Sequence, residues 1–200
     1  MELHKLFSLL DITTLNATDG EVKILGLARQ VQMVYEQSGD VFLPASICVF
    51  PNWVEVLKQN TQTLPIELAT VTGGFPLGQT LTQVKMLETH AAIEKGATEI
   101  DMVINRGAFL SGRYQQVFDE IVEIKRACGE AHLKVILETG ELGTYDHVRL
   151  ASDIAMEAGA DFIKTSTGKV TPAATLPVTL VMLQAIADHY RRTGKMIGMK

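Results

Sequence analysis

The chain has 200 residues, of which 46% are hydrophobic and 20% are charged, and its formal net charge at pH 7 is −5. This composition is typical of a folded globular protein and excludes a largely disordered chain. The negative charge gives no general attraction to nucleic acid or anionic lipid, so a bound phosphate needs a local basic site. No window approaches the ~20 apolar residues of a membrane span, and the N-terminus resembles no secretory signal, which predicts a cytoplasmic protein.

Short apolar segments recur along the chain and predict strands. A first strand is expected near Asp11. The others are expected at residues 46–50, 66–72, 99–104, 133–138, 161–165 and 196–200. Because these segments are continuously apolar rather than alternating, both of their faces are expected to be covered, as in a parallel sheet.

Three helices are expected between the strands, because apolar residues recur there every three or four positions. Their apolar faces consist of Leu81, Val84, Leu87 and Ala91, of Val117, Ile121, Ile124 and Cys128, and of Val148, Ala151, Ala155 and Ala158. Gly96, Gly129 and Gly159 follow the expected helix ends, where glycine favours termination. Alternating strands and helices predict an α/β fold, either a barrel or an open doubly wound sheet.

Two segments of the chain are similar to each other. IEKGATEIDMV (residues 93–103) and MEAGADFIKTS (residues 156–166) both run from a helix end through Gly-Ala into a strand. When they are aligned on their glycines, Asp101 of the first coincides with Lys164 of the second. A carboxylate and an ammonium group thus occupy equivalent positions near the C-terminal ends of two strands. In barrels and in open α/β sheets, that end of the strands carries the chemistry.

Several charged residues are expected near the C-terminal ends of strands, namely Asp11, Asp101, Glu138, Lys164 and Lys200. One lysine in such a position is more often a solvated residue just beyond the core. Burying any one of these charges alone would be costly, however, so their convergence favours a paired polar centre with a function.

The segment STGK (residues 166–169) could hold a phosphate through backbone N–H groups, with Lys169 as a positive point charge. It is not a P-loop, because that motif needs glycine at position 163 and Ser or Thr at position 170. This chain has Ile163 and Val170 there.

No metal or cofactor is expected. The five histidines are too scattered for two to share a helical turn, and Cys48 and Cys128 lack zinc-site spacing. In their apolar surroundings both cysteines are expected to be buried structural thiols. The tripeptide Tyr145-Asp146-His147 is expected at a helix start, where aspartate commonly has a capping role rather than a catalytic one.

Several segments, in register along almost the entire chain, resemble the deoxyribose-phosphate aldolases, a family of Schiff-base (class I) aldolases. They are LLDITTLN, SICVFP, ELATVTGGFPLG, GATEIDMVIN, LKVILETGEL, AGADFIKTSTGK and IGMK. The resemblance implies one TIM (β/α)8 barrel domain over residues 1–200. It also implies that Lys164 forms the imine, that Asp101 handles protons, and that Lys200 is a second lysine beside them.

The implied reaction is the reversible, metal-free cleavage of 2-deoxy-D-ribose 5-phosphate to acetaldehyde and D-glyceraldehyde 3-phosphate, in deoxyribonucleotide catabolism. The lysine must attack as a free amine, yet a reference pKa of ~10.4 leaves less than about a thousandth of it neutral at pH 7. Partial burial and the cation of Lys200 are expected to lower the pKa of Lys164. Substrate and phosphate are expected to bind at Asp11, Thr167, Gly168 and Lys169. The expected partners are small molecules, and a homodimer is left open.

The resemblance further implies an incomplete barrel. Family members continue past MIGMK with a Gly-Gly loop, an eighth strand and its phosphate-binding turn. A (β/α)8 barrel has about 250 residues, whereas only about seven strands are expected here. We therefore expect a C-terminally truncated chain that is poorly soluble or nearly inactive when it is produced alone.

Two other functions stay open. The chain could be a Schiff-base aldolase of another sugar phosphate or of a keto acid, which would form an imine with pyruvate rather than acetaldehyde. It could also be a catalytically impaired barrel fragment that serves as a binding module. In that case its function would survive the replacement of Lys164 by leucine.

Overall fold

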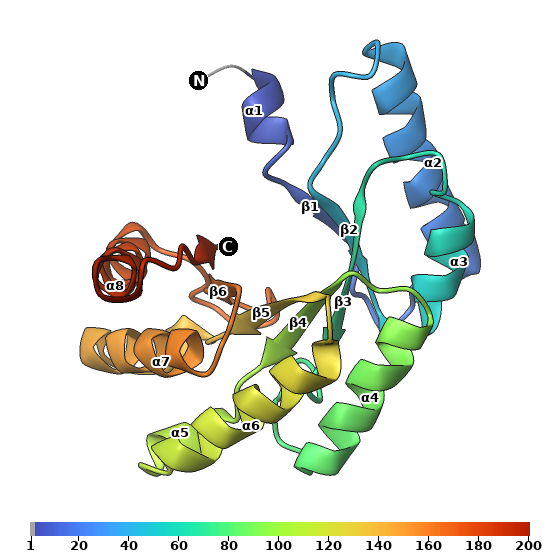
Figure 1. Ribbon diagram of the computed structural model, residues 1–200. Coiled ribbons are helices and arrows are strands. Elements are labelled where there is room, and N and C mark those ends of the chain that lie inside the picture. Colours follow the sequence, from blue (N-terminus) through green and yellow to red (C-terminus); the bar gives the residue numbers. More distant parts are fainter. Residues whose placement is uncertain (1–2) are drawn as a thin grey trace. The chain divides into compact units, whose positions relative to one another are not determined.

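The computed structural model describes residues 3–200, and Figure 1 shows their helices and strands. The chain divides into two compact units, one made of residues up to 71 with 91–99, the other of residues 72–90 with 100–200. Within residues 3–200, no helix combines the length and the apolar character that a membrane crossing requires.

The first unit is built on three parallel strands. β1 (Asp11–Thr13) pairs with β2 (Ser46–Val49), which pairs with β3 (Glu67–Thr72). Its helices are α1 (Leu3–Phe7), α2 (Glu21–Gln37) and α3 (Val54–Gln59), the last preceded by the 3-10 turn η1 (Pro51–Trp53). Every residue of β2 is buried, as a strand covered on both faces requires.

The second unit contains the strands β4 (Glu99–Val103), β5 (His132–Ile136), β6 (Phe162–Lys164) and β7 (Gly198–Met199), in that order in the sheet. β6 runs parallel to both of its neighbours. The helices are α4 (Thr82–Glu94), of which residues 91–94 belong to the first unit, α5 (Arg106–Leu110), α6 (Tyr114–Cys128), α7 (Tyr145–Glu157) and α8 (Leu176–Thr193). A 3-10 turn, η2 (Thr139–Glu141), follows β5. α7 and α8 pack side by side (Figure 1).

The predicted strands are confirmed, with ends that differ from the prediction by no more than two residues. The expected apolar faces of α6 and α7 are also confirmed, because all eight of their residues are buried. Gly96, Gly129 and Gly159 follow helix ends with positive φ values of 103°, 55° and 100°, a region that glycine enters without steric cost. α2 and α8 were not predicted.

The orientation of α4 contradicts the sequence prediction. Leu81, Val84 and Leu87, expected to face the core, are 69%, 48% and 70% exposed. The buried side of the helix instead carries Lys85 and Thr89.

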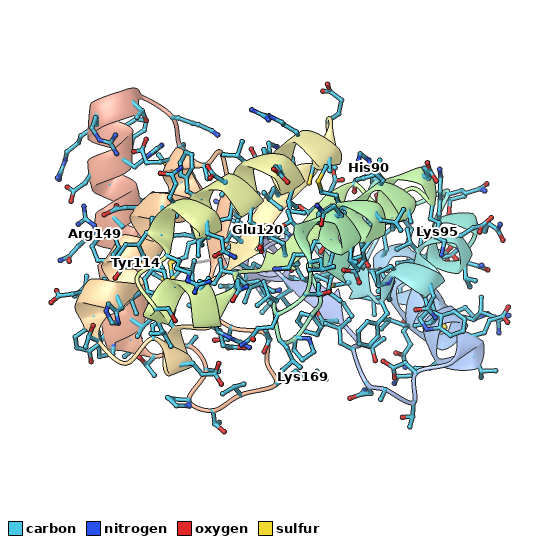
Figure 2. The ribbon with its side chains drawn as sticks, turned by 90° about the horizontal axis from the view of Figure 1, so that it is seen from below. His90, Lys95, Tyr114, Glu120, Arg149 and Lys169 are labelled. Carbon is cyan, nitrogen blue, oxygen red and sulfur yellow. The ribbon has the colours of Figure 1, made fainter. Side chains whose placement is uncertain are left out.

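The buried polar residues of α4 have partners, which explains this orientation. Lys85 Nζ donates to the carbonyl oxygen of Gly78 at 2.6 Å and forms an ion pair with Glu120 of α6. Glu120 is labelled in Figure 2. Thr89 donates its hydroxyl to the backbone oxygen of Lys85 at 2.9 Å. An apolar pattern alone cannot reveal this, because the helix is oriented by satisfied polar contacts in its buried face.

Candidate active site

The centre of the candidate site is a contact between β4 and β6. Nζ of Lys164, the last residue of β6, donates to Oδ2 of Asp101 at 2.6 Å. The Asp101 side chain is fully buried, whereas that of Lys164 is 17% exposed. The two equivalent positions of the internal repeat therefore meet, and the lysine keeps some access to solvent.

A third charged side chain, which the sequence did not single out, belongs to this cluster. Lys134 of β5 is only 2% exposed, and its Nζ lies 3.5 Å from Oδ1 of Asp101 and 5.9 Å from the ring centroid of Phe162. The distance makes an ion pair, but Oδ1 is buried and accepts no hydrogen bond from any residue in the described range. The available signal was a lysine inside an apolar strand, the same signal that marked Lys164.

The strand register explains why these side chains converge. Lys134 lies opposite Phe162, and Ile136 lies opposite Lys164. Opposite residues of paired strands, and residues two apart on one strand, project to the same face of a sheet. Lys134 and Lys164 therefore leave the sheet on one face.

Gly198 of β7 makes room on that face. It lies opposite Phe162, and a Cβ at this position would be 2.1 Å from Cδ1 of the Phe162 ring. Only glycine lets the ring occupy this space without a shift.

Lys200 follows β7 and stands opposite Lys164. Its N–H donates to the carbonyl oxygen of Ile163, and its own carbonyl oxygen accepts from the N–H of Thr165, both at 3.0 Å. These two bonds bracket Lys164, so the Cβ atoms of both lysines project from the same face of the sheet. The backbone thus brings the two predicted lysines to adjacent positions on neighbouring strands.

The pairing of β5 with β6 becomes irregular just beyond Ile136. The Leu137 N–H donates to the carbonyl oxygen of Lys164, and the Thr139 N–H to that of Thr165, both at 2.9 Å. Thr139 is two residues after Leu137, whereas Thr165 is only one residue after Lys164. Glu138 is therefore the extra residue of a bulge. Glu138 adopts a left-handed conformation, with φ 53° and ψ 59°. For a residue other than glycine such a conformation costs about 1 kcal/mol or more and needs fixed surroundings.

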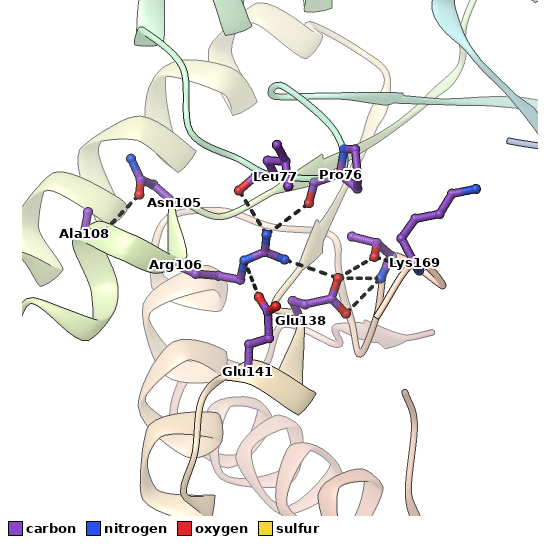
Figure 3. A network of polar contacts seen from close by, with 9 residues as sticks. Pro76, Leu77, Asn105, Arg106, Ala108, Glu138, Glu141 and Lys169 are labelled. Atoms are coloured by element: carbon purple, nitrogen blue, oxygen red, sulfur yellow. Dashed lines mark hydrogen bonds and ion pairs between the residues drawn. The ribbon is translucent and has the colours of Figure 1, made fainter. Parts of the chain in front are cut away.

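Arg106, at the start of α5, supplies part of those surroundings (Figure 3). Its Nη1 lies 3.2 Å from Oε2 of Glu138, and its Nε lies 3.0 Å from Oε2 of Glu141. Its Nη2 donates to the carbonyl oxygens of Pro76 and Leu77 at 3.2 and 3.1 Å. One buried guanidinium group therefore ties together the loops that follow β3, β4 and β5.

The turn after β6 is attached to the carboxylate of Glu138. The N–H of Thr167 lies 3.2 and 3.4 Å from the two carboxylate oxygens of Glu138, and its hydroxyl donates to Oε2. The hydroxyl in turn accepts from the N–H of Lys169 at 3.1 Å. Gly168, with φ 78°, and Lys169 are exposed on this turn (Figure 2). Three of the residues expected to bind substrate thus share one turn.

Asp11 belongs to the first unit. It is the first residue of β1, opposite Ser46, and not near the C-terminal end of a strand as expected. Leu9 and Leu10, the apolar residues that precede Asp11 in LLDITTLN, lie in the turn and the connecting residue between α1 and β1. The strand therefore begins where it was expected to end.

The expected burial of both cysteines and the expected helix start at Tyr145 are confirmed, but Thr144 rather than Asp146 caps that helix. Cys48 and Cys128 are buried thiols outside any disulfide of the described residues, and burial raises the pKa of the Cys128 thiol to about 12. Tyr145, Asp146 and His147 form the first turn of α7, where the Thr144 side chain caps the helix by accepting from the His147 N–H at 3.1 Å.

Comparisons with known proteins show which family the chain is similar to. The profile of the DeoC/LacD family of aldolases matches residues 9–191. A Homo sapiens protein named deoxyribose-phosphate aldolase is 44% identical over 210 residues, covering 99% of this chain and 65% of that protein. The Mus musculus protein of that name is 42% identical over 212 residues, with coverages of 99% and 65%. The chain thus spans about two thirds of the length of these curated relatives.

Solved structures extend the comparison to the fold. A structure described as a tetrameric deoxyribose phosphate aldolase from Aeropyrum pernix is 29% identical and has a TM-score of 0.77, covering 92% of this chain and 74% of that one. An aldolase designated QR15 is 31% identical with a TM-score of 0.80, covering 90% and 76%. These matches and the ordered succession of strands and helices confirm the predicted α/β barrel class. The chain belongs to the DeoC/LacD family of aldolases.

Proposed function

We propose that this chain carries the imine-forming site of an aldolase that reversibly cleaves 2-deoxy-D-ribose 5-phosphate to acetaldehyde and D-glyceraldehyde 3-phosphate. The observation that carries the proposal is the 2.6 Å contact between the partly exposed Lys164 and the fully buried Asp101. An amine nucleophile beside a carboxylate is the pair that Schiff-base catalysis requires.

Lys164 acts as the nucleophile. Its neutral amine attacks the aldehyde carbon of the open-chain sugar to give a carbinolamine. The carbinolamine hydroxyl takes up a proton and leaves as water, and a protonated imine forms. Partial burial and the neighbouring cation of Lys134, together with that of Lys200 on the adjacent strand position, disfavour the ammonium form. The contact with Asp101 instead favours the ammonium form. The neutral amine of Lys164 is therefore released only when the Asp101 carboxylate binds a proton from another group.

Asp101 acts as the proton acceptor. It removes the proton of the C3 hydroxyl, directly or through a water molecule, as the C2–C3 bond breaks and its electrons move into the imine. D-glyceraldehyde 3-phosphate leaves, and an enamine of acetaldehyde remains on Lys164. Protonation of the enamine carbon and hydrolysis of the imine release acetaldehyde and restore the amine. The buried Oδ1 of Asp101, which accepts no hydrogen bond within residues 3–200, has capacity for such a proton.

The turn of Thr167, Gly168 and Lys169 receives the phosphate end of the substrate. Its position just after Lys164 in the chain, the exposure of Lys169 and the accessible backbone at Gly168 support this assignment. We further propose that the enzyme works in the cytoplasm, in the breakdown of deoxyribonucleotides, and without a metal or cofactor. A homo-oligomer is compatible with the tetramer named for the Aeropyrum pernix structure.

Reductive trapping tests the proposal directly. The full chain is incubated with acetaldehyde and borohydride, and peptide mass spectrometry locates the ethyl group that reduction of the imine leaves. The label is expected on Lys164 and is expected to disappear in Lys164→Leu. Pyruvate in place of acetaldehyde is the control for another Schiff-base aldolase. Labelling by pyruvate alone, on another residue, or equally in the leucine variant would refute the proposal.

A further inference from the structure

We propose that Glu138, held by Arg106, positions the turn of Thr167, Gly168 and Lys169 and thereby sets the affinity of the site for the phosphate end of its substrate. This inference rests on the proposed function, since it assumes that the turn receives the phosphate. Glu138 itself touches neither the reacting carbon nor Lys164 Nζ in this proposal. It is a positioning residue.

The first argument is the number of constraints on the Glu138 carboxylate. It is fully buried, it is paired with a guanidinium group, and it accepts from both the N–H and the hydroxyl of Thr167. Hydrogen bonds to an ionised acceptor are stronger and more directional than neutral ones. The Thr167 hydroxyl then accepts from the Lys169 N–H, so the constraint continues across Gly168.

The second argument is the backbone of Glu138. A left-handed conformation outside glycine is uncommon, and strain of this kind persists only where the surroundings over-determine it. A residue that continued β5 regularly would point its side chain to one face of the sheet. The bulge instead directs the Glu138 carboxylate towards the turn after β6 (Figure 3).

The third argument is that Lys164, the residue proposed to form the imine, is held by different contacts. The carbonyl oxygen of Lys164 accepts from the Leu137 N–H, and its Nζ donates to Asp101. Neither contact involves the Glu138 side chain. Loosening that side chain should therefore weaken phosphate binding much more than imine formation.

A matched control is available on the same guanidinium group. Glu141 lies 3.0 Å from Nε of Arg106, is 41% exposed, and forms no hydrogen bond with the turn among residues 3–200. Glu138→Gln and Glu141→Gln each remove one negative charge beside Arg106. Only the first change removes the ionised acceptor of Thr167.

The experiment compares two aldehydes in borohydride trapping of the full chain. The concentration that gives half-maximal labelling of Lys164 is measured for acetaldehyde, which has no phosphate, and for 2-deoxyribose 5-phosphate. Glu138→Gln is expected to raise the value for 2-deoxyribose 5-phosphate by about tenfold, the loss of about one charge-assisted hydrogen bond. The value for acetaldehyde is expected to change less than about twofold, within the usual scatter of such effects. Glu141→Gln is expected to change the ratio of the two values little.

A second pair of variants covers the case in which Glu138→Gln does not fold. Thr167→Val removes the hydroxyl that links Glu138 to the Lys169 N–H, whereas Thr167→Ser keeps it. The valine variant is expected to raise the half-maximal concentration of 2-deoxyribose 5-phosphate relative to that of acetaldehyde, and serine is expected to restore the ratio. Inorganic phosphate should compete with 2-deoxyribose 5-phosphate less well in the valine variant.

The outcomes separate the two proposals. If acetaldehyde does not label Lys164 in the unmodified chain, the proposed function fails. If labelling is normal but Glu138→Gln or Thr167→Val leaves the ratio of the two concentrations unchanged, or if Glu141→Gln changes it equally, the positioning role of Glu138 is wrong and the proposed function stands.

Discussion

Lys134 and Asp101 meet on the buried side of the cluster, with Nζ of the lysine 3.5 Å from Oδ1 of the carboxylate. The other carboxylate oxygen is taken by Lys164 at 2.6 Å. One anion therefore lies between two cations, which leaves a net positive charge in a poorly hydrated place. The cation of Lys134 opposes protonation of Lys164, whereas the Asp101 carboxylate favours it.

Replacing Lys134 by methionine is expected to shift the pH dependence of imine formation. The substitution removes a cation near Lys164, so the ammonium form of Lys164 is favoured and trapping by acetaldehyde reaches its half-maximal rate at a higher pH. The measurement is the trapping rate as a function of pH for both proteins. Lys195→Met, which removes an exposed cation from the segment between α8 and β7, is the control. An unchanged or lowered midpoint would show that Lys134 does not influence Lys164.

Asp101→Asn is expected to separate imine formation from proton transfer. The enamine forms only when a base removes a proton from the bound acetaldehyde imine, so exchange of the acetaldehyde methyl protons with deuterated water should slow by at least about 100-fold. Trapping on Lys164 should persist. Proton NMR follows the exchange, and the trapping experiment is the control. Exchange at an undiminished rate would remove Asp101 from the mechanism.

Lys85→Met is expected to destabilise the fold in a pH-dependent way. It leaves the Glu120 carboxylate without its cation, which costs about 3–5 kcal/mol for a buried pair. Burial already raises the pKa of Glu120, and the contact with Lys85 lowers it, so the variant has a still higher pKa. A raised carboxyl pKa gives stability below the unfolded value, which is lost as the pH rises through the folded value. The loss should therefore be larger at pH 8 than at pH 5.

Urea denaturation at the two pH values measures this difference. The double variant Lys85→Met, Glu120→Leu is the matched control, because exchanging a buried ion pair for apolar side chains is often nearly neutral. It should recover most of the lost stability and the pH dependence should disappear. A loss that is equal at both pH values would mean that the Glu120 carboxylate is not left charged and buried.

Cys128 is expected to resist thiol reagents in the folded chain. With a pKa of about 12, its thiolate fraction at pH 8 is about one in ten thousand, compared with about one in ten for the ordinary value of 9.0. Ellman's reagent should therefore release little colour from the native protein, whereas both thiols should react in guanidinium chloride. Rapid reaction of Cys128 without denaturant would contradict its burial.

The sequence predicted the strands and two helices well because their signals are local. Continuous apolar runs and helical spacing arise from burial, and α6 and α7 follow that pattern fully. α4 does not, since its buried side is defined by the partners of Lys85, which lie 7 and 35 residues away in the chain. An interpretation based on apolar spacing alone therefore selected the wrong face.

The candidate site shows the same limit. Asp101 and Lys164 could be related from the repeat, because equivalent positions in repeated βα units project to one face of a sheet. Lys134 was overlooked although it is a lysine in an apolar strand, since its carboxylate partner is on another strand. Glu138 was noticed only as a charge at a strand end, and its left-handed backbone and its link to Thr167 have no local signature.

The bulge at Glu138 gives the two ends of the proposed substrate different kinds of support. Lys164, the residue proposed to form the imine, lies in the regular ladder of backbone hydrogen bonds, where a change at one residue disturbs its neighbours. The turn beyond it depends on one irregular residue and one arginine. Redesign of the bulge is therefore expected to change recognition of the phosphate end of a substrate. Cleavage of the carbon–carbon bond is expected to stay unchanged.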